Sequence, residues 1–355
     1  MSNEESESGQ NQSTLPSLNS VVQALTTDGN GNIYVGGSFF SVGGLNVNYI
    51  AKWNGSNWAP LGQGISGGPL CQVSCLLWAN NSLYVGGQFS RAGNVQASNI
   101  ARWDGTTWTA LSDGLNGSVS ALASNGSTIY ATGSFSKSGT IDTPSVAQWD
   151  GSSWSGLGSG IAGASISTRS LAVFNNNLYL GGHFRSVNGV AANNIAMWNG
   201  STWSALGLGT DGFLDNVLAL VSTGSTLYVG GAFKKAGGNI TNGIAQWNGS
   251  TWSRLGLGMG ASDGYPSVNS LAWNNSMLYA GGNFNQAGGN PANNIAVWNG
   301  SSWSALGTGL SSTVAALIGS GSNVFAGGYF DPPISGTTSY FDYWNGTMWK
   351  APGQN

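Results

Sequence analysis

Side chains that could carry out chemistry are few in this sequence, and they follow no catalytic spacing. His183 is the only histidine, so the chain offers no multi-histidine metal site. The three glutamates lie within the first seven residues, and the ten aspartates show no spacing that commits two of them to paired acid and base roles. We therefore expect no catalytic residues, no metal site, no cofactor and no enzyme activity.

Three aspartate-containing segments have alternative interpretations. Asp104 and Asp150 lie in WDGTTW and WDGSSW, which are one residue too short for a sialidase Asp box and are better explained as turns. The segment DGNGN, which begins at Asp28, resembles a calcium loop but lacks the later glycine and glutamate. The turn interpretation is therefore favoured for all three.

The two cysteines, Cys71 and Cys75, are four residues apart. In an extended strand this spacing separates their Cα atoms by roughly 13 Å, which is beyond the reach of a disulfide. Cys75 stands where other repeats have alanine or serine, which predicts a small buried thiol. Two cysteines do not determine the cellular compartment.

Charged side chains make up only 6% of the chain, and the formal net charge is −3. A nucleic-acid partner is excluded, because such binding needs clustered lysine and arginine, and a polybasic membrane patch has equally little support. No segment approaches the about 20 apolar residues of a membrane helix, so no membrane insertion is expected. The polar first residues lack the apolar run of a signal peptide. The sequence predicts a soluble monomer, either cytoplasmic or secreted after removal of a signal.

One sequence unit is repeated seven times along the chain. Each copy has an aromatic residue two positions before a Gly-Gly or Thr-Gly pair, and successive copies are 50, 46, 49, 49, 51 and 46 residues apart. The distance from the second glycine of this pair to the second tryptophan of the copy is always 21 residues, so the connections between copies hold all the variation. These aromatic residues are Tyr34, Tyr84, Tyr130, Tyr179, Tyr228, Tyr279 and Phe325.

Each unit contains four short strands separated by turn residues, and no helical periodicity is present. Four-stranded antiparallel units that cannot bury both faces alone predict an all-β, seven-bladed β-propeller whose ring closes without strand exchange. An extended solenoid is the alternative, but it would need polar capping repeats, and none is visible. We expect a disordered acidic tail over residues 1–16 and a single propeller over residues 17–355. The expected blades are residues 18–64, 65–114, 115–160, 161–209, 210–260, 261–309 and 310–355.

The pattern GG…W[ND]GxxWxxLG resembles the kelch repeat and the galactose-oxidase-like propeller superfamily. It is also similar to tandem repeats of uncharacterised bacterial proteins and of fungal cortical cell-polarity markers. The resemblance covers about residues 18–353 and departs from a typical kelch repeat in placing tryptophan in the third strand. It implies a propeller fold, whereas function does not follow from fold. A galactose-oxidase-like copper centre is excluded, because the chain has a single histidine.

The Asn-Gly or Asp-Gly pair of each repeat predicts a hairpin with a type I′ turn. With Asn54 and Gly55 at the turn centre, Trp53 faces Ser56, and Trp58 is its diagonal neighbour on the same face. We expect these paired indoles to fill the gaps between blades as structural residues. The pairs comprise Trp53, Trp58, Trp103, Trp108, Trp149, Trp154, Trp198, Trp203, Trp247, Trp252, Trp298, Trp303, Trp344 and Trp349.

Differences among the repeats predict where a binding site would lie. In antiparallel blades, the loop between strands two and three and the connection to the next blade emerge on one face. Candidate ligand- or partner-binding residues on this face are Arg91, Lys137, His183, Arg185, Phe213, Lys234, Lys235 and Tyr265. The alternative is that they are scattered solvated side chains. Trp78 and Trp273, near the opposite face, are either aromatic platforms or end-of-strand packing.

Several functions agree with these observations. The favoured one is a non-catalytic scaffold that presents the loops of one face to a partner, most simply a protein. The alternative is a multivalent lectin-like module, because repeated neutral grooves and abundant tryptophan suit glycan binding. An enzyme is disfavoured by the scarcity of ionisable groups. The segments NNIAMWNGSTWSALG and NNIAVWNGSSWSALG differ at two of fifteen positions, which also fits a recently amplified or designed repeat without specialised function.

Overall fold

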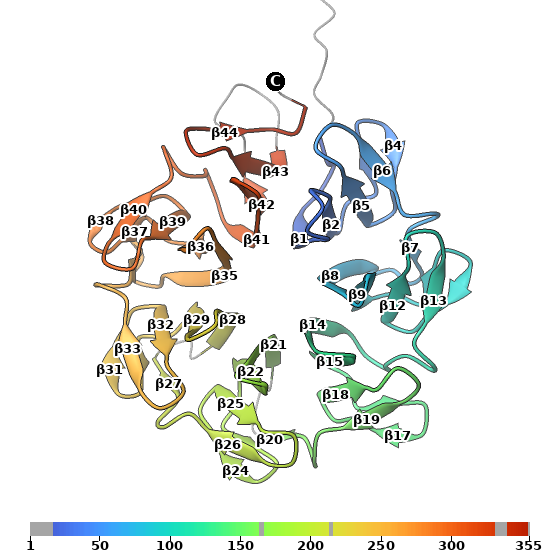
Figure 1. The fold of residues 1–355 in the computed structure, drawn as a ribbon, viewed down its shortest axis with the longest axis horizontal. Helices are drawn as coiled ribbons and strands as arrows, with labels where there is room; N and C mark the ends of the chain where they lie inside the picture. The colour runs from blue at the N-terminus through green and yellow to red at the C-terminus, as the bar shows by residue number, and fades with distance from the viewer. Residues whose placement is uncertain (1–16, 163–166, 213–215, 331–338, 354–355) are drawn as a thin grey trace, which may run out of the picture.

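The computed structural model describes residues 17–162, 167–212, 216–330 and 339–353, and the regular secondary structure of these residues is entirely β. Seven four-stranded antiparallel sheets succeed one another around a central axis (Figure 1). The predicted all-β class and the four-stranded unit are confirmed, and we call the sheets blades 1 to 7 in chain order. The predicted tail lies outside the described residues. No helix in the described part of the chain is long and apolar enough to cross a membrane.

Within each blade the strands follow chain order from the axis outwards (Figure 1). Blade 1 contains β1 (Val22–Thr27), β2 (Ile33–Gly37), β5 (Ile50–Trp53) and β6 (Trp58–Pro60), and blade 2 contains β8 (Gln72–Ala79), β9 (Ser82–Gln88), β12 (Ile100–Trp103) and β13 (Trp108–Ala110). Blade 3 contains β14 (Val119–Asn125), β15 (Thr128–Gly133), β18 (Val146–Trp149) and β19 (Trp154–Gly156), and blade 4 contains β21 (Ser167–Phe174), β22 (Asn177–His183), β25 (Ile195–Trp198) and β26 (Trp203–Ala205). The strands of blades 5 to 7 are β28 (Asn216–Ser222), β29 (Leu227–Ala232), β32 (Ile244–Trp247) and β33 (Trp252–Arg254); β35 (Ser267–Asn274), β36 (Met277–Asn283), β39 (Ile295–Trp298) and β40 (Trp303–Ala305); β41 (Val314–Ser320), β42 (Asn323–Phe330), β43 (Ser339–Trp344) and β44 (Trp349–Lys350).

Blades 1 to 6 carry a small hairpin between their second and third strands, which the sequence did not predict. In four blades this hairpin also pairs with the connection from the preceding blade, so hairpins and connections lie on one face, which we call the loop face. The hairpin strands are β3 (Ser41–Val42) and β4 (Leu45–Asn46), β10 (Arg91–Ala92) and β11 (Val95–Gln96), β16 (Lys137–Ser138) and β17 (Ile141–Asp142), β23 (Ser186–Val187) and β24 (Val190–Ala191), β30 (Lys235–Ala236) and β31 (Asn239–Ile240), and β37 (Gln286–Ala287) and β38 (Asn290–Pro291). The connection strands are β7 (Ile65–Ser66), β20 (Ile161–Ala162), β27 (Thr210–Asp211) and β34 (Met259–Gly260).

Every innermost strand contains a β-bulge at the same place, where one residue is left without a partner on the second strand. The bulge forces a close backbone approach, because a Cβ on Gly37 would overlap the carbonyl oxygen of Val21. The second glycine of each pair is thus required by the bulge. The bulged residues are Gln23, Ser74, Ser120, Arg169, Leu218, Asn269 and Ala315.

The first glycine of the pair allows neighbouring blades to pack closely. A Cβ on Gly36 would overlap the Val73 side chain of blade 2, and a Cβ on Gly327 of blade 7 would overlap Val22 of blade 1. The innermost strand of blade 1 accordingly lies between those of blades 2 and 7 (Figure 1). The first and last blades therefore contact each other directly.

The predicted register of the Asn-Gly hairpin is wrong by two residues. Trp53 pairs with Trp58 and not with Ser56, so the two indoles are directly opposite rather than diagonal. The same pairing of tryptophans occurs in all seven blades, with ring centroids 5.1 to 5.8 Å apart. The two indoles of a pair still share one face of the sheet.

The side chain before the glycine explains this shift. Asn54 Oδ1 accepts the backbone N–H groups of Ser56 at 3.0 Å and Asn57 at 2.7 Å, so Asn54 precedes the turn instead of forming its first central residue. Gly55 is the only residue of the turn with positive φ, at 94°. A type I′ turn, which needs positive φ at both central residues, is therefore excluded.

The second tryptophan of a pair reaches the preceding blade. In six blades its Nε1–H donates to the carbonyl of a leucine just beyond that blade's outer strand, at 2.8 to 3.1 Å. Trp58 of blade 1 differs, because its buried Nε1 has no partner among the described residues and its ring packs edge-on against Phe341 at 5.4 Å. The indole pairs thus lie between blades.

Substituting phenylalanine for Trp252 should cost about 1 kcal/mol more unfolding free energy than the same change at Trp58. Both indoles are half-buried, but only Trp252 donates a hydrogen bond, to the Leu206 carbonyl at 2.8 Å. Urea unfolding of the two variants measures the difference. Equal losses would show that the indole–carbonyl bond contributes nothing to the contact between blades.

Candidate functional site

One position on the loop face combines a constant backbone with a variable side chain. It follows the phenylalanine repeated in each blade, and its carbonyl accepts the N–H of the residue seven positions later at 2.8 to 3.0 Å in blades 1 to 6. We call it the variable position. It is occupied by Phe40, Ser90, Ser136, Arg185, Lys234 and Asn285. The scaffold therefore presents a different side chain in the same place from blade to blade.

Five of the eight predicted binding residues occupy this position or the next one. Arg185 and Lys234 stand at the variable position, and Arg91, Lys137 and Lys235 stand one residue later, at the start of the small hairpin. All except Lys235, which is half-buried, are exposed. These five cations thus lie on the loop face of blades 2 to 5, with two in blade 5 and one in each of the other three blades.

The other three predicted residues lie in different settings. His183 is half-buried at the end of β22, and Tyr265 is 50% exposed in the connection from blade 5 to blade 6. Phe213 lies outside the described residues. Lys234 and Tyr265 line the same pocket of the loop face.

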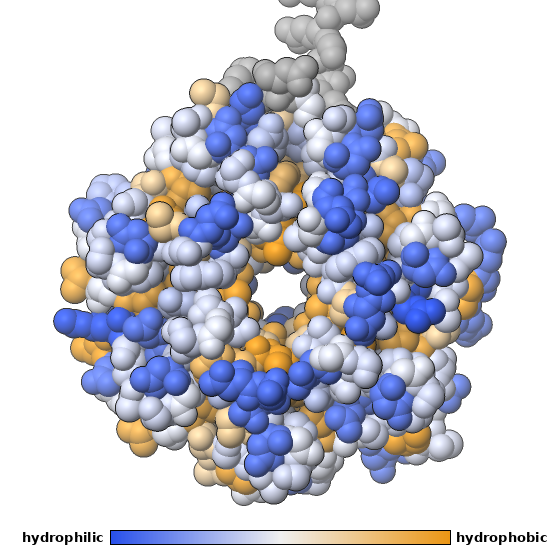
Figure 2. Space-filling view, viewed as in Figure 1, coloured by the Kyte–Doolittle hydropathy of each residue, from blue (hydrophilic) through white to orange (hydrophobic). Residues whose placement is uncertain are grey.

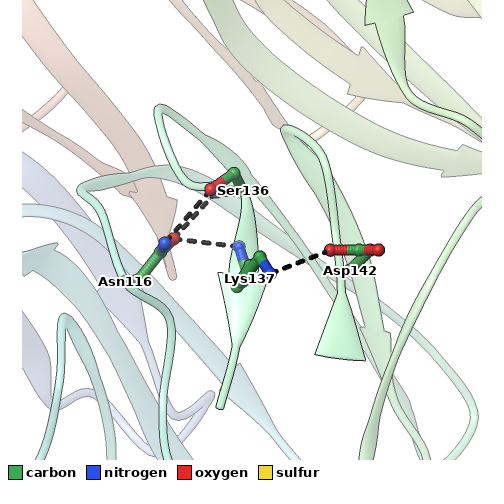
Figure 3. Close-up of polar contacts among 4 residues, drawn as sticks. All are labelled: Asn116, Ser136, Lys137 and Asp142. Carbon is green, nitrogen blue, oxygen red and sulfur yellow. Dashed lines mark hydrogen bonds and ion pairs between the residues drawn. The ribbon is translucent and has the colours of Figure 1, made fainter. Parts of the chain in front are cut away.

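Lys137 belongs to a local network that orders its own hairpin (Figure 3). Asn116, from the connection before blade 3, accepts the N–H groups of Ser136 at 2.8 Å and Lys137 at 2.9 Å through Oδ1. The Lys137 Nζ lies 3.5 Å from a carboxylate oxygen of Asp142, and both side chains are exposed, so the pair adds little stability. Arg91 is likewise engaged, because its guanidinium donates to a carbonyl of its own hairpin at 3.1 Å.

The pocket shared by Lys234 and Tyr265, which we call the Lys234 pocket, has a volume of about 260 Å³. It lies between blade 5 and the connection that leads to blade 6, with the buried ring of Phe233 at its base. The Lys234 N–H donates to the Asp211 carbonyl at 2.9 Å, which fixes the backbone of the lysine. The Tyr265 N–H donates to Asp263 Oδ1 at 2.9 Å, which orders the connection. A cation and an exposed phenol therefore line one small hollow.

A larger pocket of about 460 Å³, the Asn285 pocket, occupies the loop face of blade 6. Its walls are residues 261–263, 283–285, 293–294 and 308–311. Asp263 is the only charged side chain among these residues, and the rest of the polar lining consists of neutral amides and hydroxyls. Phe284 and Leu310, both buried, give the pocket an apolar base.

The two pockets use the same part of the repeat in successive blades. Residues 230–247 and 281–298 align without gaps, so Asn285 corresponds to Lys234 and Asn283 to Ala232. The connection containing Asp263 and Tyr265 separates the pockets and contributes to both. The sequence did not predict Asp263, Asn283 or Asn285 as site residues. The alignment of the repeats could have pointed to Asn285, because it shows that this position varies from blade to blade.

Asp104 lies in a turn and not in either pocket. Its carboxylate accepts the N–H groups of Thr107 and Thr106, each at 2.8 Å, and these hydrogen bonds hold the pKa of Asp104 well below its usual range. Asp150 is held in the same way. Within the described residues, no group of three or more His, Cys, Asp or Glu side chains is placed to hold a metal ion.

Both tryptophans near the opposite face stack on a tyrosine of the preceding blade, and Trp273 is also 38% exposed. Trp78 stacks on Tyr34 of the preceding blade, with ring centroids 5.4 Å apart and planes inclined by 17°. Trp273 stacks on Tyr228 in the same manner, at 5.7 Å and 18°. Cys75 is a buried free thiol, and burial raises its pKa well above the usual range.

A channel along the axis passes between the innermost strands, and Figure 2 shows it as a hollow at the centre of the ring. Its volume is about 230 Å³. Bulged residues contribute to its lining, and among the lining residues Arg169 is the only charged one. Arg169 was not predicted to line a channel, because a bulge leaves no periodic signal in the sequence.

Comparisons with known proteins agree with this geometry. Residues 1–177, just under half of the chain, match the family model "Rax2 C-terminal beta propeller domain". Among solved structures, the computationally designed Ika8 protein matches with a TM-score of 0.56 and 16% identity, over 96% of this chain and 87% of that chain, which shows the fold alone. No curated protein matches the sequence. The family-model match, the structural match and the repeated sheets together identify the chain as a β-propeller protein, similar in its first half to the Rax2 C-terminal propeller.

Proposed function

We propose that the seven sheets are the blades of a closed, kelch-like propeller that acts as a non-catalytic scaffold and binds a partner protein on its loop face. The observation that carries this proposal is the Lys234 pocket, where a cation lies beside the half-exposed ring of Tyr265. Tyrosine is among the side chains that contribute most to protein interfaces, and a basic side chain beside it adds electrostatic complementarity to an acidic partner. The diglycine supports kelch-like repeats, whereas the tryptophan of the third strand departs from the typical kelch repeat.

The chemistry of the Lys234 pocket favours binding over catalysis. Among the described lining residues, Lys234 and Tyr265 are the only titratable groups, and no carboxylate or imidazole is present to act as a general base. The cation favours a partner that presents an acidic side chain, and the phenol adds apolar area to the contact. A monomer suffices, because one chain builds the whole pocket.

A lectin with seven equal tryptophan sites is not favoured by the same observations. The paired indoles lie between blades, and six of them donate to leucine carbonyls of the preceding blade. The variable position carries lysine in blade 5 and asparagine in blade 6, so the pockets are not equivalent.

The proposal is tested by quantitative affinity capture from an extract of the source organism. We expect a protein that is enriched by the wild type and reduced about tenfold by Lys234→Glu and by Tyr265→Ala. Lys137→Ala, which changes a cation already paired with Asp142, is the control and should retain the partner. Capture that survives both pocket substitutions, or that is lost in the control, would contradict the proposed interface.

A further inference from the structure

We propose that the Asn285 pocket of blade 6 binds one neutral sugar residue. This site is separate from the Lys234 pocket and is occupied once per chain. The proposal rests on an unpaired buried acceptor, a neighbouring carboxylate with a free oxygen, and the absence of a cation from the described residues that line the pocket. It goes beyond the proposed protein interface and does not depend on it.

Asn285 presents a buried polar atom that the protein itself leaves unpaired. Its side-chain Oδ1 is buried and has no hydrogen-bond partner among the described residues. Its backbone is fixed on both sides, since its N–H donates to the Gly260 carbonyl and its carbonyl accepts the Ala292 N–H, each at 3.0 Å. A buried unpaired acceptor costs about 1 to 3 kcal/mol, and a rotation of the amide that turned Oδ1 into the pocket would let a ligand hydroxyl group recover this cost by donating to it.

Asp263 supplies a second acceptor in the same pocket. Its Oδ1 accepts the Tyr265 N–H at 2.9 Å, whereas Oδ2 has no partner among the described residues. The exposed Asn283, which also lines the pocket, adds an amide that both donates and accepts. Hydroxyl groups can donate to the carboxylate and to Asn285 while accepting from an amide, so adjacent hydroxyls match this set.

Two other asparagines shape the pocket through hydrogen bonds donated by their amide nitrogens. The Asn293 amide donates to the Thr308 carbonyl at 3.1 Å, and the Asn294 amide donates to the Leu310 carbonyl at 2.8 Å. These bonds hold the connection to blade 7 against blade 6. The walls are therefore set before a ligand arrives, which lowers the entropic cost of binding.

The charge and size of the pocket select among ligand classes. With Asp263 as the only charged side chain of the lining, an anionic ligand such as a phosphate ester or a sialic acid would be repelled. The volume of 460 Å³ lies within the range of small-molecule sites. The buried Phe284 and Leu310 offer an apolar base for the C–H face of a pyranose ring.

Saturation-transfer NMR and calorimetry on the full chain test this proposal. The probes are glucose, galactose, mannose, fucose and N-acetylglucosamine, with glucosamine as a cationic probe and glucose 6-phosphate as an anionic one. We expect at least one neutral sugar to bind at one site per chain. Asn285→Ala and Asp263→Asn should each weaken this binding about tenfold or more, and Asp263→Asn retains the oxygen that accepts the Tyr265 N–H.

Controls separate the site from the fold and from the protein interface. Asn290→Ala changes an exposed amide of the neighbouring hairpin and should leave sugar binding intact. Asn285→Ser introduces the side chain of blades 2 and 3 on the same backbone, so it should fold normally and still lose the sugar. Lys234→Glu should reduce partner capture about tenfold while sparing the sugar.

Three outcomes would overturn the proposal. One is the absence of binding by every neutral sugar in a correctly folded wild type. Another is binding that survives both Asn285→Ala and Asp263→Asn. The third is binding of glucosamine alone, which would assign the pocket to an ammonium group held by Asp263.

Discussion

Replacing Asp342 with alanine is expected to raise the free energy of unfolding by about 3 kcal/mol at pH 8. Asp342 lies on β43 and is 1% exposed. Its Oδ1 accepts the Ser339 hydroxyl at 2.8 Å, but Oδ2 has no partner among the described residues. At the same position the other six blades have fully buried alanine: Ala51, Ala101, Ala147, Ala196, Ala245 and Ala296. The core around this position thus normally holds a methyl group instead of a carboxyl group.

The gain should depend on pH because burial raises the pKa of Asp342 from 3.8 to about 6. Below the unfolded value of 3.8 the carboxyl is protonated in both states, so its ionisation costs the fold nothing. As pH rises through 6, ionisation increasingly favours the unfolded chain, and the full cost is present at pH 8. Wild-type stability should therefore fall between pH 4 and pH 7, and the variant should lack this fall.

Denaturant unfolding of both proteins at pH 4, 6 and 8 measures the effect. Asp211→Ala, which removes an exposed carboxyl, is the control and should show no comparable gain at pH 8. A difference between wild type and Asp342→Ala that is constant across this pH range would contradict the assigned cause, because a cavity or a packing change does not titrate.

Replacing Gly87 with alanine is expected to lower the free energy of unfolding by about 3 kcal/mol. A Cβ at this position would overlap the carbonyl oxygen of Gln72 and would press on the Val73 Cα. Both groups belong to the bulged backbone of the innermost strand, which cannot rotate away as a side chain can. The substitution must therefore distort the bulge or separate the two strands.

Gly224→Ala provides a matched control within the same fold. This glycine lies in the turn between β28 and β29, its φ is not positive, and a Cβ there would meet nothing within 4 Å. We expect its stability to stay within about 0.5 kcal/mol of the wild type, or to rise slightly because alanine restricts the unfolded chain. If both substitutions cost the same, the close approach at Gly87 is not what requires glycine there.

The strand content was predictable because the repeat supplies seven copies of the same pattern. The Asn-Gly hairpin failed in its register, because propensity rules assign the pair to the turn centre, whereas the Asn54 side chain instead accepts two N–H groups of the turn. The small hairpins were missed for a related reason. Strands of two residues, such as Ser41–Val42, are too short to show alternation.

The candidate site was predictable only in part. Lys234 and Tyr265 differ in type from their surroundings, and this marked them in the sequence. Asn285 was not distinguished, because asparagine is abundant in the turns of this chain. Asn285 is a candidate because its Oδ1 has no hydrogen-bond partner among the described residues. Its surroundings include residues 261–263 and 308–311, which line the same pocket and are distant in the sequence.

The constant backbone of the variable position has a consequence for how such a protein can change over generations. Duplicating a blade copies a finished, stable frame, and a single codon then decides whether that frame presents Phe40, Ser90, Arg185, Lys234 or Asn285. Since the hydrogen bond shared by blades 1 to 6 is accepted by the main-chain carbonyl of the variable position, such a mutation leaves this bond in place. New recognition can therefore be acquired one blade at a time, while the remaining copies keep the molecule folded.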